Sequence, residues 1–538
     1  MTIDRRSLLG LLGAGVALPA DAAASPPAPA LSFAHGVASG DPTPAGAILW
    51  TRVTPDDPTH AAPVPLTWHV ADGDRIVASG RAEARASRDW TVKAEPKTLK
   101  PGAEYRYWFV AGRVRSPEGR FRTLPTGATP DAVFAVVTCS LYTAGFFNAY
   151  RAIAELPRVD AVVHLGDYIY EYGQDGYGGA IGKKIGRLIE PAHEVVTLAD
   201  YRARHAHYKA DPDLQAAHAR AAMIAVWDDH ETANDSWVGG AENHQPATEG
   251  DWGKRKAAAL QAYFEWMPIR DPRPGQPWAA INRSFQFGDL ATLAMVETRL
   301  LARAEQTEIE KHTDAAFYAE AVKRQNDPAR EMLGEPQRRW LEGVLAASVK
   351  AGTPWQVLGN QVVMARVVDP VIDLARVPEA YRANVAAAGA ARAAGLPSDL
   401  DGWNGYPFAR ERLYASLRRA GSRPLVLSGD SHAFWANQLH DEHGVPVGAE
   451  LGTSAITSPS IGDAIPDVPV GRMLEEANPE VLFCDQRAKG FILLTLTPEC
   501  ARAEYRAVST VMAKQFERRT LVTYEVRAGD PGATLRRV

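Results

Sequence analysis

Four short apolar runs, each followed at once by polar residues, constrain the fold of this chain more than any other feature. The segments are residues 136–139, 162–170, 224–231 and 425–432. Each run is as long as a strand that is buried on both faces. Because open α/β folds bind ligands where their strands end, we expect the polar tips to meet along one edge of a sheet. A thiol, a phenol, carboxylates and imidazoles gathered in one place favour a multinuclear metal site.

The N-terminus predicts export. Arg5 and Arg6 precede an apolar stretch that ends at Leu18, and small residues follow it, which is typical of a twin-arginine signal peptide. We predict a signal peptide and Pro/Ala spacer over residues 1–30, export by the twin-arginine machinery, and a periplasmic or secreted protein. An uncleaved anchor is the alternative, but the stretch is shorter than the roughly 20 residues that span a bilayer. No later segment is apolar enough for a stable membrane span after cleavage.

The composition narrows the classes of function. The formal net charge of −5 argues against specific nucleic-acid binding, which favours a basic face. The chain has three cysteines, so at least one stays unpaired in an oxidising compartment. Cys484 and Cys500 could form a bridge, and Cys139 would then be left over. Metal ligation would explain an unpaired Cys139.

Residues 31–124 have a β pattern throughout. Short β-like runs at 47–53, 66–70 and 105–110 are separated by turn formers, which predicts a small all-β domain. The stretch 99–107 resembles a late strand of fibronectin type III-like domains. No residue in this unit suggests chemistry, so we expect it to position or shield a catalytic domain.

The catalytic domain is predicted over residues 132–538, after a linker that contains Pro and Gly. Strands and helices alternate here, which is typical of an α/β fold. The expected strands that carry the polar tips are 134–137, 159–165, 223–227 and 425–427. The Gly-rich stretch 173–186 is expected to be a loop.

The strongest site motif is the Gly-Asp-x-x-Tyr segment after the second of these strands. Gly166 lets the backbone turn sharply, so that Asp167 can bridge two cations and Tyr170 can reach one of them. After the third strand, we predict that Asp229 is a metal ligand and that His230 is the catalytic group.

The remaining predicted ligands follow the first and fourth strands. Asp430 and His432 are two residues apart on one side of an extended segment, so both can contact one metal centre. Cys139 ends the first strand and is predicted to join them. Asp228 and Glu231 are expected to orient the imidazole and the metal from outside.

The donor types suggest the metals. A thiolate, a phenolate and a carboxylate on one ion favour ferric iron over zinc, whose usual ligands are Cys and His. The remaining carboxylates favour a hard divalent partner such as Ca²⁺. Mn²⁺, Mg²⁺ and Zn²⁺ are the alternatives for that partner.

These motifs resemble the calcineurin-like metallophosphatase superfamily, and more closely its alkaline phosphatase D (PhoD-type) family. The matching segments are residues 36–42, 49–52, 146–150, 226–231, 327–334 and 427–432. The resemblance extends over nearly the whole mature chain. It implies an α/β fold, a metallophosphatase-like two-sheet sandwich flanked by helices, preceded by the small all-β, fibronectin type III-like domain. It also implies an exported phosphomonoesterase or phosphodiesterase that uses one Fe³⁺ and Ca²⁺.

Carried onto this chain, the resemblance implies overlapping iron and calcium ligands. Those near iron are Cys139, Asp167, Tyr170 and His432, and those serving calcium are Asp167, Asp229 and Asp430. Asn234 is a further candidate for binding a cation or the substrate. Glu297 stands where an Asp would be expected before Thr-Arg, so the role of this carboxylate is open.

Four later residues are candidates for substrate contacts at the entrance of the site: Arg366, Asp401, Trp403 and Tyr406. A packed aromatic loop is an equally good interpretation of the segment 401–406.

The predicted reaction is hydrolysis of a phosphate monoester or diester. Cations would hold the phosphate oxygens and lower the pKa of a bound water, and the resulting hydroxide would attack phosphorus. His230 would protonate the leaving alkoxide, a step worth about 10²–10⁴ in rate.

Three alternatives stay open. A purple acid phosphatase shares Gly-Asp-x-x-Tyr, but it would show Gly-Asn-His-Glu and Gly-His-x-His, where this chain has Asp-Asp-His-Glu and Gly-Asp-Ser-His. A phospholipase D-like phosphodiesterase fits the same chemistry. A non-catalytic, metal-stabilised surface-binding protein would have a coordinatively closed site, whereas this ligand set leaves room for water and substrate.

Overall fold

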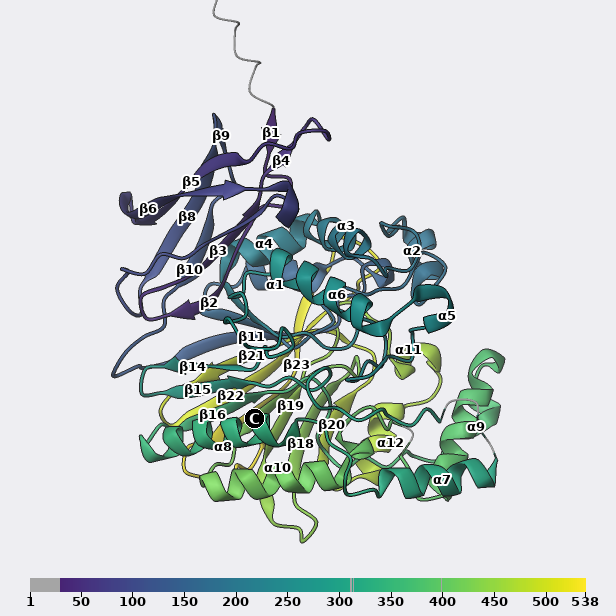
Figure 1. Cartoon of the computed structure of the whole chain (residues 1–538). Coiled ribbons are helices and arrows are strands. Elements are labelled where there is room, and N and C mark those ends of the chain that lie inside the picture. Colours follow the sequence, from purple (N-terminus) through teal and green to yellow (C-terminus); the bar gives the residue numbers. More distant parts are fainter. Residues whose placement is uncertain (1–29, 310–311, 313, 398) are drawn as a thin grey trace, which may run out of the picture.

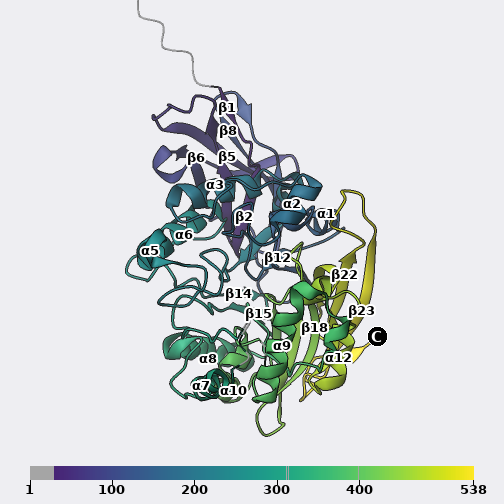
Figure 2. The ribbon, with the colours of Figure 1, turned by 90° about the vertical axis from the view of Figure 1, so that its right-hand side faces the viewer.

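The computed structural model describes residues 30–309, 312, 314–397 and 399–538 (Figure 1). The predicted signal segment, except Ala30, lies outside the described residues. A β-rich N-terminal unit sits on a larger body in which two sheets are flanked by helices (Figures 1 and 2). Within the described residues, no helix is long and apolar enough to cross a membrane.

The first large sheet has ten strands among the described residues, in the order β24-β23-β22-β21-β11-β12-β13-β2-β3-β7. They are β2 (Val37–Thr43), β3 (Gly46–Arg52), β7 (Thr91–Ala94), β11 (Ala132–Val137), β12 (Ala161–His164), β13 (Ala222–Ala225), β21 (Lys489–Leu496), β22 (Cys500–Val508), β23 (Arg518–Arg527) and β24 (Arg536–Arg537). The central strands β11, β12 and β13 are parallel and fully or almost fully buried. Their burial on both faces explains the continuous apolar runs in the sequence.

The second large sheet has the order β14-β15-β16-β17-β19-β18-β20. Its strands are β14 (Arg283–Phe287), β15 (Ala291–Met295), β16 (Trp355–Gly359), β17 (Leu425–Ser428), β18 (Phe434–His440), β19 (Pro446–Gly452) and β20 (Val481–Asp485). Strands β14 and β15 pair antiparallel and form a hairpin around Gly288. The two sheets share one apolar core, in which the rings of Phe134 and Phe287 meet edge to face at 4.9 Å.

Helices cover the outer faces of this sandwich (Figure 1). On the side of the first sheet lie α1 (Asn148–Ala154), α2 (Gly179–Ile185), α3 (Leu198–Lys209), α4 (Pro212–Arg220), α5 (Pro246–Glu249) and α6 (Trp252–Trp266). Near the second sheet lie α7 (Ala315–Gln325), α8 (Gly334–Lys350), α9 (Glu379–Ala393), α10 (Pro407–Ala420), α11 (Ile461–Ala464) and α12 (Val470–Ala477). Helix α8 shows why they dock: Leu341, Leu345 and Ser348 recur at helical spacing and are its buried face.

The Gly-rich stretch 173–186 is not a plain loop, because helix α2 forms within it. Gly178 and Gly186 flank α2 with φ of 76° and 74°, a left-handed conformation that is accessible to glycine. The glycines therefore bound a short helix here.

The N-terminal unit is all-β, but its strands belong to more than one sheet. Strands β5 (Val64–Asp72), β6 (Arg75–Ala84), β8 (Glu104–Ala111), β9 (Val114–Arg115) and β10 (Gly119–Arg122) form a sheet of their own, and β1 (Leu31–Ser32) pairs with β4 (Thr54–Pro55). Strands β2, β3 and β7 instead extend the first large sheet, where Gly40 of β2 pairs with Met223 of β13. The unit is thus continuous with the catalytic body.

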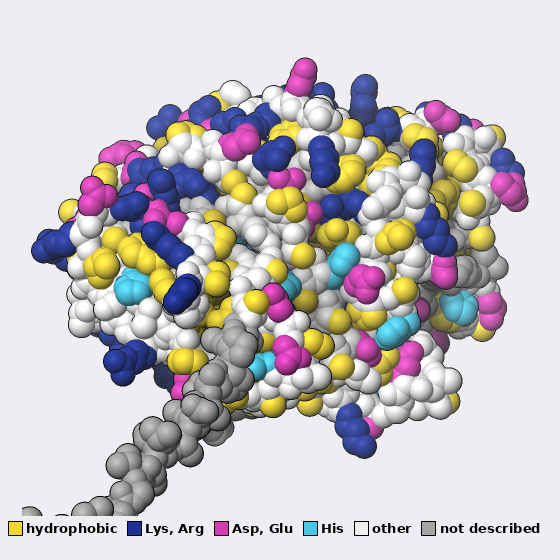
Figure 3. Space-filling view, turned by 90° about the horizontal axis from the view of Figure 1, so that it is seen from above, with side chains coloured by type: hydrophobic (Ala, Val, Ile, Leu, Met, Phe, Trp, Pro, Cys, Tyr) yellow, Lys and Arg dark blue, Asp and Glu magenta, His cyan; other side chains and the backbone are white. Residues whose placement is uncertain are grey.

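The surface charge is mixed. Seen from the side of the N-terminal unit, Lys and Arg side chains are interspersed with Asp and Glu side chains (Figure 3). This mixture agrees with the modest net charge of −5.

Candidate active site

The predicted site residues follow the ends of four buried strands. Cys139 follows β11, Asp167 and Tyr170 follow β12, Asp229 and His230 follow β13, and Asp430 and His432 follow β17. The four strands do not share one sheet as expected, because β17 lies in the second sheet. The polar tips meet instead at one end of the sandwich, across the two sheets, where the loop bonds of Gly429 to Gln361 and of Ile456 to Thr138 also lie.

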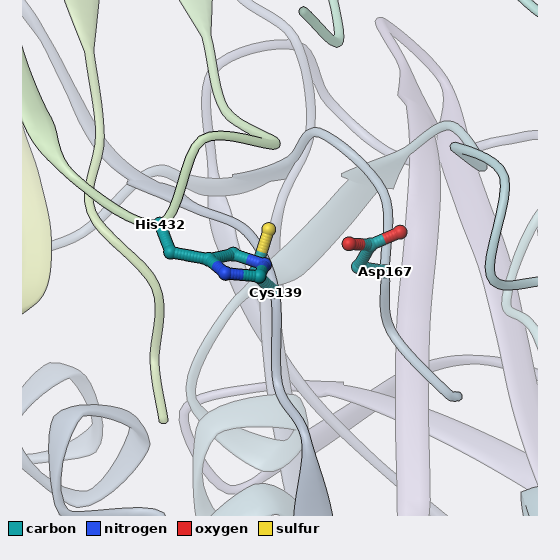
Figure 4. Close-up of side chains that lie close together, drawn as sticks. All are labelled: Cys139, Asp167 and His432. Carbon is teal, nitrogen blue, oxygen red and sulfur yellow. The ribbon is translucent and has the colours of Figure 1, made fainter. Parts of the chain in front are cut away.

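Three overlapping groups of ligand atoms result. They are Cys139, Asp167 and His432 (Figure 4), then Asp167, Asp229 and His230, and then Asp228, Asp229 and Asp430. Within each group the potential ligand atoms all lie within 4.8 Å of one another. Asp167 and Asp229 each belong to two groups, so they connect the three into one continuous cluster.

The backbone at these residues is held in an uncommon conformation. Nine non-glycine residues of the described chain have positive φ, and four of them are predicted ligands with φ between 56° and 62°: Cys139, Asp167, Asp430 and His432. Such residues cost about 1–3 kcal/mol each and persist where the surrounding structure fixes them, often at functional sites. The loops are therefore shaped to aim these side chains.

His432 presents a free lone pair to the cluster. Its Nδ1 lies 2.6 Å from the carbonyl oxygen of Pro459, which can only accept, so Nδ1 carries the proton. Nε2 is then unprotonated and lies 3.3 Å from the Tyr170 hydroxyl. That hydroxyl also donates to Asp167 Oδ2 at 2.9 Å and lies 2.7 Å from Ser458 Oγ. A neutral imidazole held in this way is a typical metal ligand.

Several carboxylate oxygens of the cluster accept no hydrogen bond from the described residues. Asp167 Oδ1, Asp228 Oδ2 and Asp229 Oδ1 are buried and have no hydrogen-bond partner in the described part of the chain. A buried, unpaired carboxylate oxygen is costly unless a cation or donor meets it. The carboxylate oxygens of the cluster are therefore suited to binding cations.

The crowded carboxylates and their burial raise the pKa values of several groups in the cluster. Burial raises the pKa of Asp430 and of the Cys139 thiol, and the neighbouring carboxylates raise both further. Burial, and then Asp167, also raise the pKa of the Tyr170 hydroxyl. These groups favour their neutral forms until positive charge enters the cluster.

A buried arginine, Arg299, brings a positive charge into the acidic cluster. The Arg299 guanidinium is fully buried, bonds to Asp228 through Nε, and donates from Nη1 to Asp401 at 2.7 Å. Its Nη2 lies 3.4 Å from Asp430 Oδ1 and 3.6 Å from Asp229 Oδ1. Arg299 therefore holds four carboxylates of the site in place, a role that the sequence analysis missed.

His230 is paired with a carboxylate that the sequence analysis also missed. His230 Nδ1 lies 2.7 Å from Glu171 Oε2, and Glu171 is fully buried. Glu171 Oε1 accepts from the Asn234 backbone at 2.7 Å and from Asn243 Nδ2 at 2.8 Å. Burial lowers the pKa of His230, but Asp229, Glu171 and Asp167 outweigh it and raise the pKa well above its usual value. These carboxylates favour the protonated imidazole, which is the form that can donate a proton.

Glu231 ties two of the loops together. Its carboxylate accepts from the backbone nitrogens of Asp167 at 3.0 Å, Tyr168 at 2.6 Å and Asp228 at 2.8 Å. These bonds fix the Asp167 loop against the Asp228 loop, as expected for a residue that orients ligands from outside the site.

The residues predicted at the entrance lie in two different environments. Asp401 lines a large cavity beside the cluster and is bound by Arg299 and Arg303. Trp403 and Tyr406 are buried, with Trp403 Nε1 donating to Asn360 Oδ1 and the Tyr406 hydroxyl donating to Ala304. Of the two interpretations given for the segment 401–406, the structure agrees with the packed aromatic loop for these two residues, because both lie in the core.

Two further candidates have other partners. The Arg366 guanidinium is bound by Glu411 and Glu480 and does not line the cavity, so a contact of Arg366 with substrate stays a prediction. Asn234 donates from its side chain to Glu242 at 3.2 Å, while its backbone nitrogen binds Glu171. A direct role for the Asn234 side chain stays a prediction.

The cysteines outside the site are not joined. Cys484 and Cys500 are both free thiols, and Cys484 Sγ accepts from Gln486 Nε2 at 3.2 Å. The considered bridge between them is absent from the described structure.

Comparison with known proteins identifies the family. The model of the PhoD-like phosphatase family matches residues 134–505, and the model of its N-terminal domain matches residues 19–125. The chain belongs to the PhoD-like phosphatase family. It is 33% identical over 496 residues to alkaline phosphatase D of Bacillus subtilis (strain 168), a match that covers 89% of this chain and 78% of that protein. A solved structure described as the structure of PhoD aligns with a TM-score of 0.76 and 30% identity, covering 94% of this chain and 92% of that one.

Membership in the PhoD-like phosphatase family makes the chain a phosphoric ester hydrolase with the mixed α/β architecture described above. The Glu297 carboxylate, which differs from the residue expected in this family, lies outside the ligand groups. It is buried and accepts from the backbone nitrogens of Arg299 and Leu300 and from Trp227 Nε1. Glu297 therefore shapes the loop that delivers Arg299.

Proposed function

We propose that this PhoD-like phosphatase is an exported, metal-dependent hydrolase of phosphate monoesters or diesters that uses Fe³⁺ and Ca²⁺. The observation that carries the proposal is the continuous cluster formed by the three ligand groups. A cluster that joins a thiol, the imidazole of His432 and several carboxylates, with the Tyr170 phenol bonded to Asp167, fits a centre with more than one metal.

The iron part of the proposal rests on the donors around Tyr170. Cys139, Asp167, Tyr170 and His432 would hold Fe³⁺, with the unprotonated His432 Nε2 and the unpaired Asp167 Oδ1 as support. Asp167, Asp229 and Asp430 would hold Ca²⁺, because carboxylate oxygens are the ligands this ion prefers. Mn²⁺, Mg²⁺ and Zn²⁺ are the alternatives to Ca²⁺, and elemental analysis of the purified enzyme would distinguish these ions.

The chain's own residues would divide the remaining work. When bound, the cations hold phosphate oxygens and lower the pKa of a coordinated water. His230, paired with Glu171, would donate its proton to the oxygen of the leaving group. Glu171 fixes the orientation of the imidazole, and Arg299 keeps Asp228 and Asp430 from separating.

The metal assignment is tested with two single variants of the enzyme purified from its exported form. We expect Cys139→Ala and Tyr170→Phe to lose iron, any phenolate-to-iron colour, and most activity on both a monoester and a diester. Cys484→Ala is the matched control, because this buried thiol lies outside the ligand groups. Full iron content in both site variants would contradict the assignment.

Export by the twin-arginine route is part of the proposal and depends on sequence alone. Replacing Arg5 and Arg6 together by Lys is expected to leave active enzyme inside the cell. Undiminished enzyme outside the cytoplasm in that variant would contradict this route.

A further inference from the structure

A large cavity opens beside the metal-ligand cluster. Its volume is about 1220 Å³, above the 300–1,000 Å³ that is usual for small-ligand sites. At one end it is lined by Asp401, Asp430 and His432, which belong to the candidate active site. A phosphate group bound at the cluster would fill only that end, so most of the cavity would be left for another part of a ligand.

The walls away from the cluster are mainly apolar. They come from the segment after β16, from helix α9 and from helices α11 and α12. Figures 1 and 2 show α9 and α12 on the same side of the molecule. The apolar side chains that line them include Val363, Val367, Ile372, Val385, Val470 and Leu474. Helix α9 turns small residues toward the space, among them Ala388, so the cavity is not filled from that side.

The rim of the cavity exposes large apolar side chains to solvent. Val371 is 69% exposed, and Leu374, Tyr381, Ile461 and Tyr177 are each 38–41% exposed. Single exposed apolar residues are ordinary, but a group of them around one opening marks a binding surface.

The charges lining the cavity restrict what can enter. Among the described residues, Arg392 is the one Arg or Lys side chain that lines it, whereas the acidic lining residues include Asp235, Glu308, Asp401 and Asp463. A polyanion, such as a nucleic-acid strand with further phosphates, would meet repulsion there. An occupant without extra negative charge is favoured.

We propose that this cavity is a subsite for the apolar organic group of the substrate, so that the enzyme prefers phosphate esters carrying an extended, uncharged alkyl or acyl chain. The proposal rests on the proposed function, because the phosphate of the same molecule would lie at the Asp430 and His432 end. Burial of the chain against α9 and the segment 363–374 would supply binding energy that a bare phosphate ester cannot obtain.

The first test uses diesters that share one leaving group. Methyl, butyl and octyl 4-nitrophenyl phosphates release the same 4-nitrophenolate, so the chemical step is held constant while the chain length changes. Below the concentrations at which the esters form micelles, we expect kcat/KM to rise with chain length, by up to about fourfold per buried methylene. Equal or falling kcat/KM from methyl to octyl would overturn the proposal.

The second test narrows the cavity. Ala388→Trp on α9 is expected to lower kcat/KM for the octyl ester at least tenfold and to bring the octyl-to-methyl ratio close to one. Ala383→Trp is the matched control on the same helix, because Ala383 is exposed and does not line the cavity, and it should keep the wild-type ratio. A wild-type ratio in Ala388→Trp would overturn the proposal.

The third test does not need turnover, so it separates this subsite from the proposed function. We expect octylphosphonate to bind at least tenfold more tightly than methylphosphonate by calorimetry, and to compete with 4-nitrophenyl phosphate. Tight, competitive binding without hydrolysis of any ester would refute the proposed function and support the subsite. Equal binding of both phosphonates, or binding of octylphosphonate without competition, would overturn the subsite while hydrolysis of small esters still supports the proposed function.

Discussion

The stability of this enzyme is expected to fall in acid because several of its histidines are buried and neutral. His205 allows the contribution of one such histidine to be tested. His205 is fully buried, and neither ring nitrogen has a hydrogen-bond partner within the described residues. Its ring is stacked on Trp266 with centroids 6.3 Å apart. Burial, then Lys209 and Arg204, lower the pKa of His205 to about 3.

The sign and size of the effect follow from linkage. Below about pH 6.5 the imidazole of the unfolded chain takes up a proton, whereas the folded chain keeps His205 neutral down to about pH 3. Stability is therefore lost as the pH falls below 6.5. At pH 5 the difference in proton binding amounts to about 2 kcal/mol of unfolding free energy relative to pH 8.

The variant His205→Phe removes this titration and keeps an aromatic ring on Trp266. Urea titrations of wild type and variant at pH 8 and pH 5, with the metal supply held equal, give the loss of unfolding free energy for each protein. We expect the loss to be about 2 kcal/mol smaller in His205→Phe. The exposed His443 supplies the control His443→Phe, whose loss should equal that of wild type.

The reasoning would be refuted if His205→Phe lost as much stability in acid as the wild type. Neighbouring histidines act in the same direction, since burial lowers the pKa of His35 and of His164 to about 3. A single variant therefore reduces the acid sensitivity and does not remove it.

Two further predictions concern the site itself. In Glu171→Gln the partner of His230 loses its charge, so kcat should fall about a hundredfold while phosphate-ester binding changes little; an unchanged kcat would remove Glu171 from the proposed mechanism. Gly166→Ala should cost about 3 kcal/mol, because φ there is 115° and the new Cβ would lie 2.4 Å from Asp228 Cβ. The control Gly343→Ala lies on helix α8, where a Cβ would enter open space, and it should be neutral or stabilising. Equal thermal midpoints for the two variants would contradict the packing argument.

The strands that carry the site were predictable because they are buried on both faces. The runs before Cys139, Asp167 and Asp229 became β11, β12 and β13, since continuous apolar residues of this length fit the centre of a parallel sheet. The run before Asp430 also became a strand, but in the other sheet. A run of apolar residues does not record which sheet it joins, because that choice depends on the whole topology.

Residues that act on the site from a distance were not predictable in the same way. Arg299 follows a short apolar strand, β15, and nothing local indicates that its guanidinium meets carboxylates from three other loops. Glu171 directly follows Tyr170 in a segment of aromatic residues, and an acidic residue in such surroundings was the one available signal. For Trp403 and Tyr406 the sequence left two interpretations open, since composition does not separate a core aromatic residue from one that contacts ligand.

The junction between β2 and β13 has a consequence for any shortened version of this protein. Gly40 approaches so closely that a Cβ at this position would lie 2.5 Å from the Met223 carbonyl oxygen and 2.3 Å from that of Pro268. A chain starting near residue 131 would leave the outer side of β13, and with it the strand that aims Asp229 and His230, as a bare sheet margin open to pairing with other molecules. The N-terminal unit therefore protects the edge of the catalytic sheet, and shortened preparations should aggregate before they lose activity.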